Sequence, residues 1–362
     1  MDKKDEIILQ QLEVIRTMTE RNLRSMGDDF WGTPFEGVLS PKSPSAPPSG
    51  GKPVGSADGK MPAQPSDGKT AGGQPAAKAE KTEVVEPLPK EDMKDLQAEL
   101  DSYIGLATVK EEVRNLINMA SVYKLRRQHD LPTTDMSLHM VFTGNPGTGK
   151  TMMARMMARI YRSLDILSKG QLVEVDRSGL VAGYVGQTAI KTQKVIQKAI
   201  GGVLFIDEAY ALNGKSENDF GQEAIDTILK AMEDHRDDLV VIVAGYTDLM
   251  DRFIHSNPGL ESRFNRFLLF EDYTPDEMLD IFKMQCKKGC YQLTEEAQPL
   301  IRDYIAEESA DDSFGNARGV RNLFEHVLVA QNNRLATMEK ITREDLMTIT
   351  ADDVLRARGK VD

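Results

Sequence analysis

The sequence has few cysteines, few aromatic residues and no long apolar run. Its 362 residues include two cysteines and one tryptophan, and aromatic residues make up 6% of the chain. This is too little cysteine for a disulfide framework, so the composition indicates a cytoplasmic protein. No apolar stretch approaches the ~20 residues of a membrane-spanning helix. The first six residues, MDKKDE, lack the apolar core of a signal peptide, so neither a membrane span nor secretion is predicted.

Net positive charge is also missing. The formal net charge is −12 at pH 7, which does not favour nonspecific binding to nucleic acid, and we expect no nucleic-acid partner. Hydrophobic residues make up 40% of the chain, so a large core can form. The length is sufficient for two or three domains.

The two cysteines, Cys286 and Cys290, are four residues apart. In a helix this spacing would place both thiols on one face. No third cysteine and no nearby histidine completes a zinc site. We therefore predict that both thiols pack inside a helical region.

Residues 1–36 are predicted to form an amphipathic helix followed by an aromatic cluster that holds the only tryptophan. Helical periodicity is seen in the apolar residues Ile8, Leu12, Ile15 and Met18. A lone helix cannot make a core. This segment could therefore dock on the main domain, on another copy of the chain or on a separate partner.

Residues 37–91 are predicted to be a disordered linker. They are rich in proline, glycine, serine, alanine and lysine and contain almost nothing apolar to bury. About 50 flexible residues reach on the order of 40 Å. The linker would therefore act as a tether for the N-terminal helix.

Residues 92–273 are predicted to form an α/β domain in which helices flank a parallel five-stranded sheet. Apolar runs typical of strands occur at 138–142, 172–175, 203–206, 239–244 and 267–270. Helical patterns are found at 109–128, 152–161, 191–200 and 221–235. Alternation of this kind is typical of parallel sheets covered on both faces. Such sheets bind ligands beyond the carboxyl ends of their strands.

Residues 274–362 are predicted to form a small all-helical domain, because the strand signal disappears there. Thr274 is a suitable N-cap for the first helix. Helices are predicted at 278–287, 295–308, 320–338 and 343–358.

One motif organises the chain. Residues 144–151, GNPGTGKT, match the P-loop spacing G-x-x-x-x-G-K-[ST] and lie between a predicted strand and a predicted helix. Lys150 would place a positive charge at the β- and γ-phosphates, and the Thr151 hydroxyl would bind Mg²⁺. We therefore expect ATP and Mg²⁺, held by Asn145, Pro146, Gly147, Thr148, Gly149, Lys150 and Thr151.

Two carboxylates follow the apolar run at 203–206. They emerge at the end of a buried strand beside the P-loop. Asp207 is expected to bind Mg²⁺ through water, and Glu208 to orient or deprotonate an attacking water. This pair favours hydrolysis over phosphoryl transfer to a small acceptor.

Four segments together resemble an AAA+ ATPase: residues 144–151, 206–208, 244–246 and 257–264. Within that superfamily they most resemble the group containing stage V sporulation protein K and red-type Rubisco activase. The resemblance covers about residues 92–358 and leaves out the N-terminal helix and the linker. It implies an ATPase with a helical lid that assembles into a ring, a hexamer, and acts on a protein substrate.

The resemblance also implies roles for residues near the phosphates. Thr247 follows the fourth strand, where the family places a polar sensor, with Tyr246 as the alternative. Arg263 resembles the arginine finger that reaches a neighbouring subunit, with Arg266 as the alternative. A finger of this kind requires a closed ring of subunits.

Further resemblances concern the lid and the adenine pocket. Arg318 resembles the arginine that the lid contributes to the phosphates, and Arg321, one turn later, could share or replace it. Ile104 and Gly105 resemble the segment that lines the adenine pocket.

Residues 183–186, GYVG, resemble the pore loop of AAA+ unfoldases. Glycines leave such a loop free to move, and the aromatic ring of Tyr184 can grip a peptide by non-directional contact. Tyr184, Val185 and Gly186 are therefore the predicted substrate contacts.

Two kinds of function remain open from the sequence alone. The favoured one is an ATP-hydrolysing ring that remodels or threads a protein. The other is a nucleotide-dependent scaffold or switch that assembles on ATP and presents its N-terminal helix without threading. The presence of Glu208 favours the first.

Overall fold

The structure is a computed structural model that describes residues 86–132, 137–184, 186–214 and 220–359. The predicted N-terminal helix, most of the predicted linker and Val185 lie outside these residues. The last residues of the predicted linker contact the α/β domain: the Leu88 amide donates to the Lys169 carbonyl (2.9 Å), and Glu91 pairs with Arg159. No helix of the described residues is both long and apolar enough to cross a membrane.

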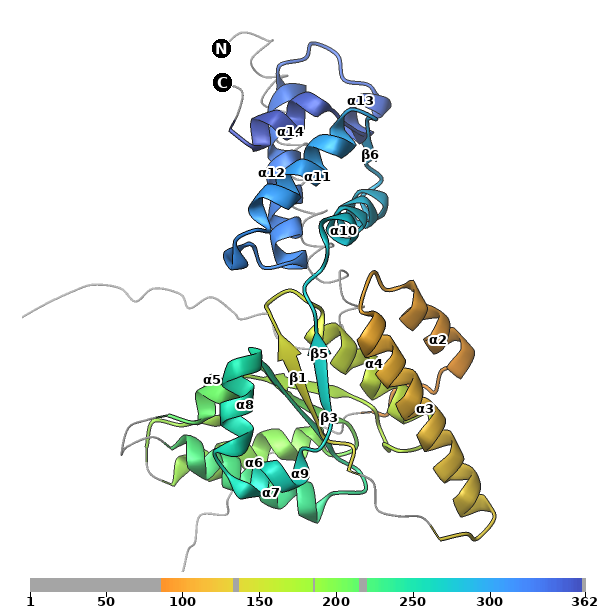
Figure 1. The fold of residues 1–362 in the computed structure, drawn as a ribbon, viewed down its shortest axis with the longest axis vertical. Helices are drawn as coiled ribbons and strands as arrows, with labels where there is room; N and C mark the ends of the chain where they lie inside the picture. The colour runs from red at the N-terminus through yellow and green to blue at the C-terminus, as the bar shows by residue number, and fades with distance from the viewer. Residues whose placement is uncertain (1–85, 133–136, 185, 215–219, 360–362) are drawn as a thin grey trace, which may run out of the picture. The chain divides into compact units, whose positions relative to one another are not determined.

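The α/β domain is built on a parallel sheet of five strands in the order β2-β3-β4-β1-β5 (Figure 1). The predicted five-stranded sheet is therefore confirmed. β2, β3 and β5 have the predicted bounds, whereas β1 starts two residues later than predicted. The strands are β1 (Met140–Gly144), β2 (Leu172–Val175), β3 (Val203–Ile206), β4 (Val240–Gly245) and β5 (Phe267–Phe270).

The three central strands, β1, β3 and β4, are buried along their whole length. Burial on both faces explains why they are nearly continuous apolar runs in the sequence. β5 lies at an edge and alternates between exposed and buried residues. Its pairing with β1 brings the residues after β5 close to the P-loop.

Helices cover both faces of the sheet. One core includes Phe142, Met153 and Phe205 and joins the sheet to α2 (Met93–Ser102), α3 (Ala107–Gln128) and α4 (Lys150–Ser163). The other core includes Val243 and Ile225. It involves α6 (Gln187–Ala199), α7 (Gly221–Asp234), α8 (Thr247–His255) and α9 (Pro258–Arg263), together with α5 (Arg177–Leu180) and the 3₁₀ helix η1 (Ala209–Leu212).

The C-terminal domain packs its helices around a third core, which includes Phe282 and Phe324. Thr274 caps its first helix as predicted, in a reciprocal capping box with Glu277. The helices are α10 (Pro275–Lys288), α11 (Ala297–Glu308), the 3₁₀ helix η2 (Asp312–Phe314), α12 (Ala317–Ala336), α13 (Arg343–Met347) and α14 (Ala351–Ala357).

The prediction of one helix over 343–358 is wrong. A short strand, β7 (Thr348–Ile349), separates α13 from α14 and pairs in parallel with β6 (Gln292–Leu293), so the domain is not purely helical. Three β-branched residues, Thr348 to Thr350, disfavour a continuous helix there. Thr350 then starts α14 through a capping box with Asp353.

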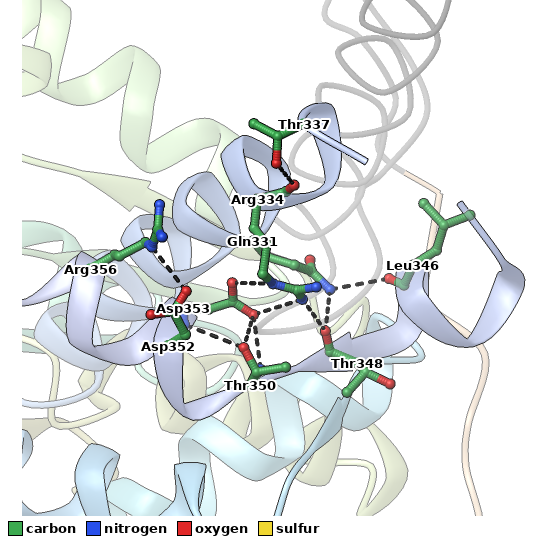
Figure 2. Close-up of polar contacts among 9 residues, drawn as sticks. All are labelled: Gln331, Arg334, Thr337, Leu346, Thr348, Thr350, Asp352, Asp353 and Arg356. Atoms are coloured by element: carbon green, nitrogen blue, oxygen red, sulfur yellow. Dashed lines mark hydrogen bonds and ion pairs between the residues drawn. The ribbon is translucent and has the colours of Figure 1, made fainter. Parts of the chain in front are cut away.

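A buried ion pair holds this C-terminal segment against α12. Asp353 is fully buried and accepts two hydrogen bonds from Arg334, at 2.8 and 2.9 Å (Figure 2). Gln331 donates to the Thr348 and Leu346 carbonyls nearby. Breaking such a pair leaves an uncompensated buried charge, which costs about 3–5 kcal/mol.

The prediction that both thiols pack inside a helical region is confirmed for Cys286 and wrong for Cys290. Cys286 is buried in α10, where desolvation raises its thiol pKa to about 12. Cys290 lies beyond the end of α10, in a left-handed conformation (φ 59°), and is exposed. α10 ends at Lys288, so helical periodicity no longer applies at Cys290.

Candidate nucleotide-binding site

The P-loop joins the end of β1 to the start of α4. Its backbone is left-handed at Gly147 (φ 75°) and Gly149 (φ 97°). A Cβ at Gly147 would lie 2.2 Å from the Gly315 carbonyl oxygen of the C-terminal domain. Glycine is therefore required at this position both by the backbone and by the close approach of that domain.

Lys150 lies at the first position of α4 and bends back over the loop. Its Nζ donates to the carbonyls of Gly144 (2.8 Å) and Asn145 (2.7 Å). Burial lowers the pKa of Lys150, and the nearby Asp207 carboxylate opposes this change. The ammonium group is thus held against the P-loop backbone.

The two predicted carboxylates emerge from β3 beside the loop. The Glu208 amide donates to Asp207 Oδ1 (3.1 Å). Glu208 itself is in the left-handed region (φ 47°, ψ 43°), which is uncommon for a residue other than glycine. Such strain costs about 1–3 kcal/mol and is concentrated at functional sites.

These residues line a cavity of about 440 Å³. The cavity combines the P-loop, the end of β3, the end of β4 and the start of α12. Its walls carry four cationic side chains and three carboxylates. The lining residues are Gly144, Pro146, Gly147, Gly149, Lys150, Thr151, Met152, Arg155, Glu174, Asp207, Glu208, Gly245, Tyr246, Ala317, Arg318 and Arg321.

The donor set fits Mg²⁺ with a nucleotide rather than a metal held by protein alone. Among the described residues there is no cluster of three or more histidine, cysteine or acidic side chains suited to a metal ion. Mg²⁺ usually takes one or two protein ligands and completes its octahedron with phosphates and water. Thr151 would supply a direct ligand and Asp207 would bind through water, and bound Mg²⁺ would neutralise phosphate charge.

Two residues that the sequence reasoning missed connect the loop to the C-terminal domain. Asp272, just after β5, accepts from Asn145 Nδ2 (2.8 Å) and from Asn316 Nδ2 (2.7 Å). Asn316 also accepts from the Tyr273 amide (2.9 Å), and the Ala317 amide donates to the Gly147 carbonyl (3.2 Å). These contacts bring the N-terminus of α12 against the P-loop.

Glu174 and Arg155 are two further cavity residues that the sequence reasoning missed. Burial raises the pKa of Glu174, while Arg155, 4.0 Å away, opposes the rise. The one available signal was a single charged residue inside the short apolar strand β2.

Comparison with known proteins agrees with this geometry. The profile described as "ATPase family associated with various cellular activities (AAA)" matches residues 140–272, and the "AAA lid domain" profile matches residues 274–362. The chloroplastic ribulose bisphosphate carboxylase/oxygenase activase of Cyanidioschyzon merolae is 46% identical over 272 residues, which is 74% of this chain and 92% of the activase. The chain belongs to the AAA ATPase family.

A further relative agrees with this assignment. Stage V sporulation protein K of Bacillus subtilis is 40% identical over 72% of this chain and 82% of its own length. The activase and stage V sporulation protein K belong to the group that the sequence resembles, so that resemblance is confirmed. The crystal structure of the FIGL-1 AAA domain matches with a TM-score of 0.51 over 73% of this chain and 83% of that domain, at 19% identity, and supports the fold.

As an AAA ATPase, the protein hydrolyses ATP, and the C-terminal domain is the lid. Arg318 and Arg321 of the lid both line the cavity. At the end of β4 the cavity is lined by Tyr246, whereas Thr247 is the first residue of α8 and is not among the lining residues. Tyr246 is therefore better placed than Thr247 to contact a phosphate.

The two candidate finger arginines of this AAA ATPase differ in their contacts. Arg266 donates to the Ser137 carbonyl (3.1 Å) and contacts the Met119 sulfur, so it is held within the fold. Arg263, at the end of α9, makes longer hydrogen bonds to Glu233 (3.3 Å) and Gly259 (3.4 Å). Neither arginine lines the cavity of its own chain.

Ile104 and Gly105 lie in the loop between α2 and α3, where they contact the start of the lid and are not among the residues that line the cavity. Ile104 packs against the lid core. Gly105 (φ 63°) faces Tyr273 and Glu277, and a Cβ there would come within 3.0 Å of both side chains. The Tyr273 hydroxyl in turn donates to the Thr148 carbonyl (3.3 Å). The segment thus contacts residues that join the lid to the P-loop.

Tyr184 is 73% exposed and lies outside the cavity. The glycines on either side, Gly183 and Gly186, have no atom within 4 Å of the position that a Cβ would occupy. Val185, the remaining predicted member of this loop, lies outside the described residues.

Proposed function

We propose that this ATPase assembles into a closed hexameric ring that uses ATP hydrolysis to pull a protein substrate through a central pore. The observation that carries the proposal is the exposure of Tyr184. Its ring is flanked by glycines with open space around them, so the ring is accessible for non-directional contact with a peptide. The threaded chain would be gripped by Tyr184, Val185 and Gly186.

In this proposal the residues around the cavity divide the chemistry. Lys150 and Arg318 bind phosphate oxygens, and Thr151 and Asp207 hold Mg²⁺, Asp207 through water. Glu208 takes a proton from the attacking water or orients it. Tyr246, or Thr247 beside it, would report the state of the γ-phosphate.

The position of Arg263 supports a ring. It lies on the surface at the end of α9, about one-third exposed, with a buried Nε that has no hydrogen-bond partner among the described residues. The exposed part of its guanidinium could bind phosphates that a neighbouring subunit presents. A finger that acts in a neighbour requires a heterologous interface, and such an interface gives a ring when its rotation closes.

We propose the class of substrate by analogy with the relatives. The name of one relative says that it activates ribulose bisphosphate carboxylase/oxygenase. We propose that this chain likewise acts on a folded protein, and that its N-terminal helix recruits a partner. A cytoplasmic location stays a prediction from the cysteine content.

Replacing Tyr184 with alanine tests the proposal. The change removes on the order of 150–250 Å² of aromatic surface. Basal ATP turnover should change little, because the side chain lies outside the cavity. Substrate-stimulated turnover and remodelling should both fall, and the matched variant Tyr184→Phe, which keeps the ring, should retain both.

A variant of this protein can be used to capture the substrate that the remodelling assay needs. A Glu208→Gln ring that holds ATP should retain bound protein, which can be recovered and identified. Remodelling of that protein at the normal rate by Tyr184→Ala would reject threading. The scaffold or switch would then become the better account.

A further inference from the structure

Asn316 is a buried polar residue at the start of α12 to which the proposed function gives no role. It is 6% exposed, and its backbone (φ 54°, ψ −128°) lies in a region that residues other than glycine rarely adopt. Such a conformation persists only where the surrounding contacts determine it. Glycine would fit this backbone without strain, so the presence of asparagine points to a use for its side chain.

The side-chain amide of Asn316 makes three hydrogen bonds. Its Oδ1 accepts from the Tyr273 amide (2.9 Å), and its Nδ2 donates to Asp272 Oδ1 (2.7 Å) and, at a longer distance, to the Pro146 carbonyl (3.4 Å). Asp272 and Tyr273 follow β5, whereas Pro146 belongs to the P-loop and lines the cavity. One side chain of the lid is thus bonded both to the end of the sheet and to the phosphate-binding loop.

The backbone beside Asn316 leads directly into the cavity wall. The Ala317 amide donates to the Gly147 carbonyl (3.2 Å), and the Val320 amide donates to the Asn316 carbonyl (3.0 Å), which closes the first turn of α12. Arg318, the second residue of this helix, lines the cavity. The place of Arg318 relative to the P-loop therefore depends on how the start of α12 is held.

We infer that Asn316 is a positioning residue: its amide holds the first turn of α12 against the P-loop and Asp272, so that Arg318 reaches the phosphate oxygens of the nucleotide. The inference rests on the proposed role of Arg318 in binding phosphate. Asp272 completes the arrangement, because its second oxygen accepts from Asn145 Nδ2 of the P-loop (2.8 Å). The carboxylate of Asp272 thus joins two asparagines, one from the loop and one from the lid.

The variant Asn316→Asp keeps the shape of the side chain and replaces its Nδ2 with an oxygen. Both donated hydrogen bonds are lost, and a second negative charge faces Asp272. ATP affinity, measured by equilibrium binding to the full chain, should fall about 10- to 100-fold, as for a lost hydrogen bond to a charged group. Asn118→Asp, the same change at an exposed position of α3, is the control and should bind ATP normally. Wild-type affinity in Asn316→Asp would overturn the inference.

Two further variants separate the side chain from the backbone. Asn316→Gly suits the left-handed backbone and should fold, yet it should also weaken ATP binding because the amide is gone. Asp272→Asn combined with Asn316→Asp places an amide opposite the new carboxylate. This pair should bind ATP more tightly than Asn316→Asp alone. Wild-type affinity in Asn316→Gly, or no recovery in the pair, would overturn the inference.

A double-mutant cycle distinguishes positioning from a general structural effect. ATP affinity is measured for the wild type, Asn316→Asp, Arg318→Ala and the double variant. If Asn316 acts through Arg318, its replacement costs nothing further once Arg318 is alanine. An equal loss in both backgrounds would show that Asn316 does not act through Arg318, and would overturn the inference.

The two proposals fail in different ways. Normal ATP affinity in Asn316→Asp, beside weak binding by Arg318→Ala, overturns the role of Asn316 and leaves that of Arg318 intact. Normal ATP affinity in Arg318→Ala overturns the role of Arg318 and the role of Asn316 with it.

Discussion

Two glycine-containing loops of the α/β domain, residues 144–149 and 183–186, are packed in opposite ways. In the first, a Cβ at Gly144 or Gly147 would lie 2.2 Å from a backbone carbonyl oxygen. In the second, a Cβ at Gly183 or Gly186 would meet nothing within 4 Å. In the first loop, glycine allows another backbone segment to come close to the loop. In the second loop, no other atoms lie near the glycines.

The difference extends to the side chains that each loop presents. Lys150, which follows the first loop, is held by two carbonyl oxygens at 2.7 and 2.8 Å. Tyr184 in the second loop is 73% exposed. Fixed charge suits a site that must recognise phosphate with one geometry. An exposed ring suits contact with chains of varied sequence, which is the role proposed for Tyr184.

The largest expected effect comes from removing the charge beside the packed loop. Lys150→Ala should abolish ATP binding, because the repulsion between phosphates is left uncompensated. Glu208→Gln should instead bind ATP and stall before hydrolysis. Nucleotide affinity and turnover are measured separately to distinguish these outcomes.

A lysine away from the cavity provides the control for this prediction. Lys283 in α10 is half-buried, pairs loosely with Asp280 (3.7 Å) and does not line the cavity, so Lys283→Ala should bind ATP normally. Normal ATP affinity in Lys150→Ala would show that ATP binding at the P-loop does not depend on the positive charge of Lys150.

The next largest effect is expected at Arg263. Arginine fingers contribute about 10³–10⁵-fold to the rate of GTP hydrolysis in the systems where they were measured. Arg263→Ala should lower turnover strongly and leave nucleotide binding nearly intact, because the side chain is outside the cavity of its own chain. Mixing it with Lys150→Ala protein should restore activity at the mixed interfaces.

Arg266→Ala is the matched variant. Its contacts with Ser137 and Met119 predict a loss of thermal stability rather than a specific loss of turnover. If co-assembled mixtures of Arg263→Ala and Lys150→Ala stay inactive, Arg263 does not act in a neighbouring subunit, and Arg266 or a finger within the same chain becomes the better candidate.

Contiguous motifs made much of this architecture predictable. The P-loop is eight consecutive residues, and Asp207 and Glu208 follow a strand whose four apolar residues are all buried. Each strand of the sheet was found because burial on one or both faces imposes an apolar run. The roles of the individual site residues are still predictions.

Contacts between distant residues were not predictable. Asp272 and Asn316 are 44 positions apart, and nothing in either local pattern indicates that they meet. Asn316 precedes a helix and so resembles an N-cap, yet its side chain does not cap α12. The break in the predicted helix at 343–358 likewise depends on pairing with β6, more than 50 positions earlier.

The smallest expected effect is that of replacing Gly147, a glycine of the P-loop. Gly147→Ala places a Cβ in a left-handed backbone, which costs about 1–2 kcal/mol, and presses it against the Gly315 carbonyl of the lid. The lid or the loop must shift, so ATP affinity should fall about tenfold or more, by equilibrium binding. Gly183→Ala makes the same chemical change where the Cβ meets nothing, and ATP affinity should not change. Equal affinities in the two variants would mean that the close approach of the lid to the P-loop has no part in holding the nucleotide.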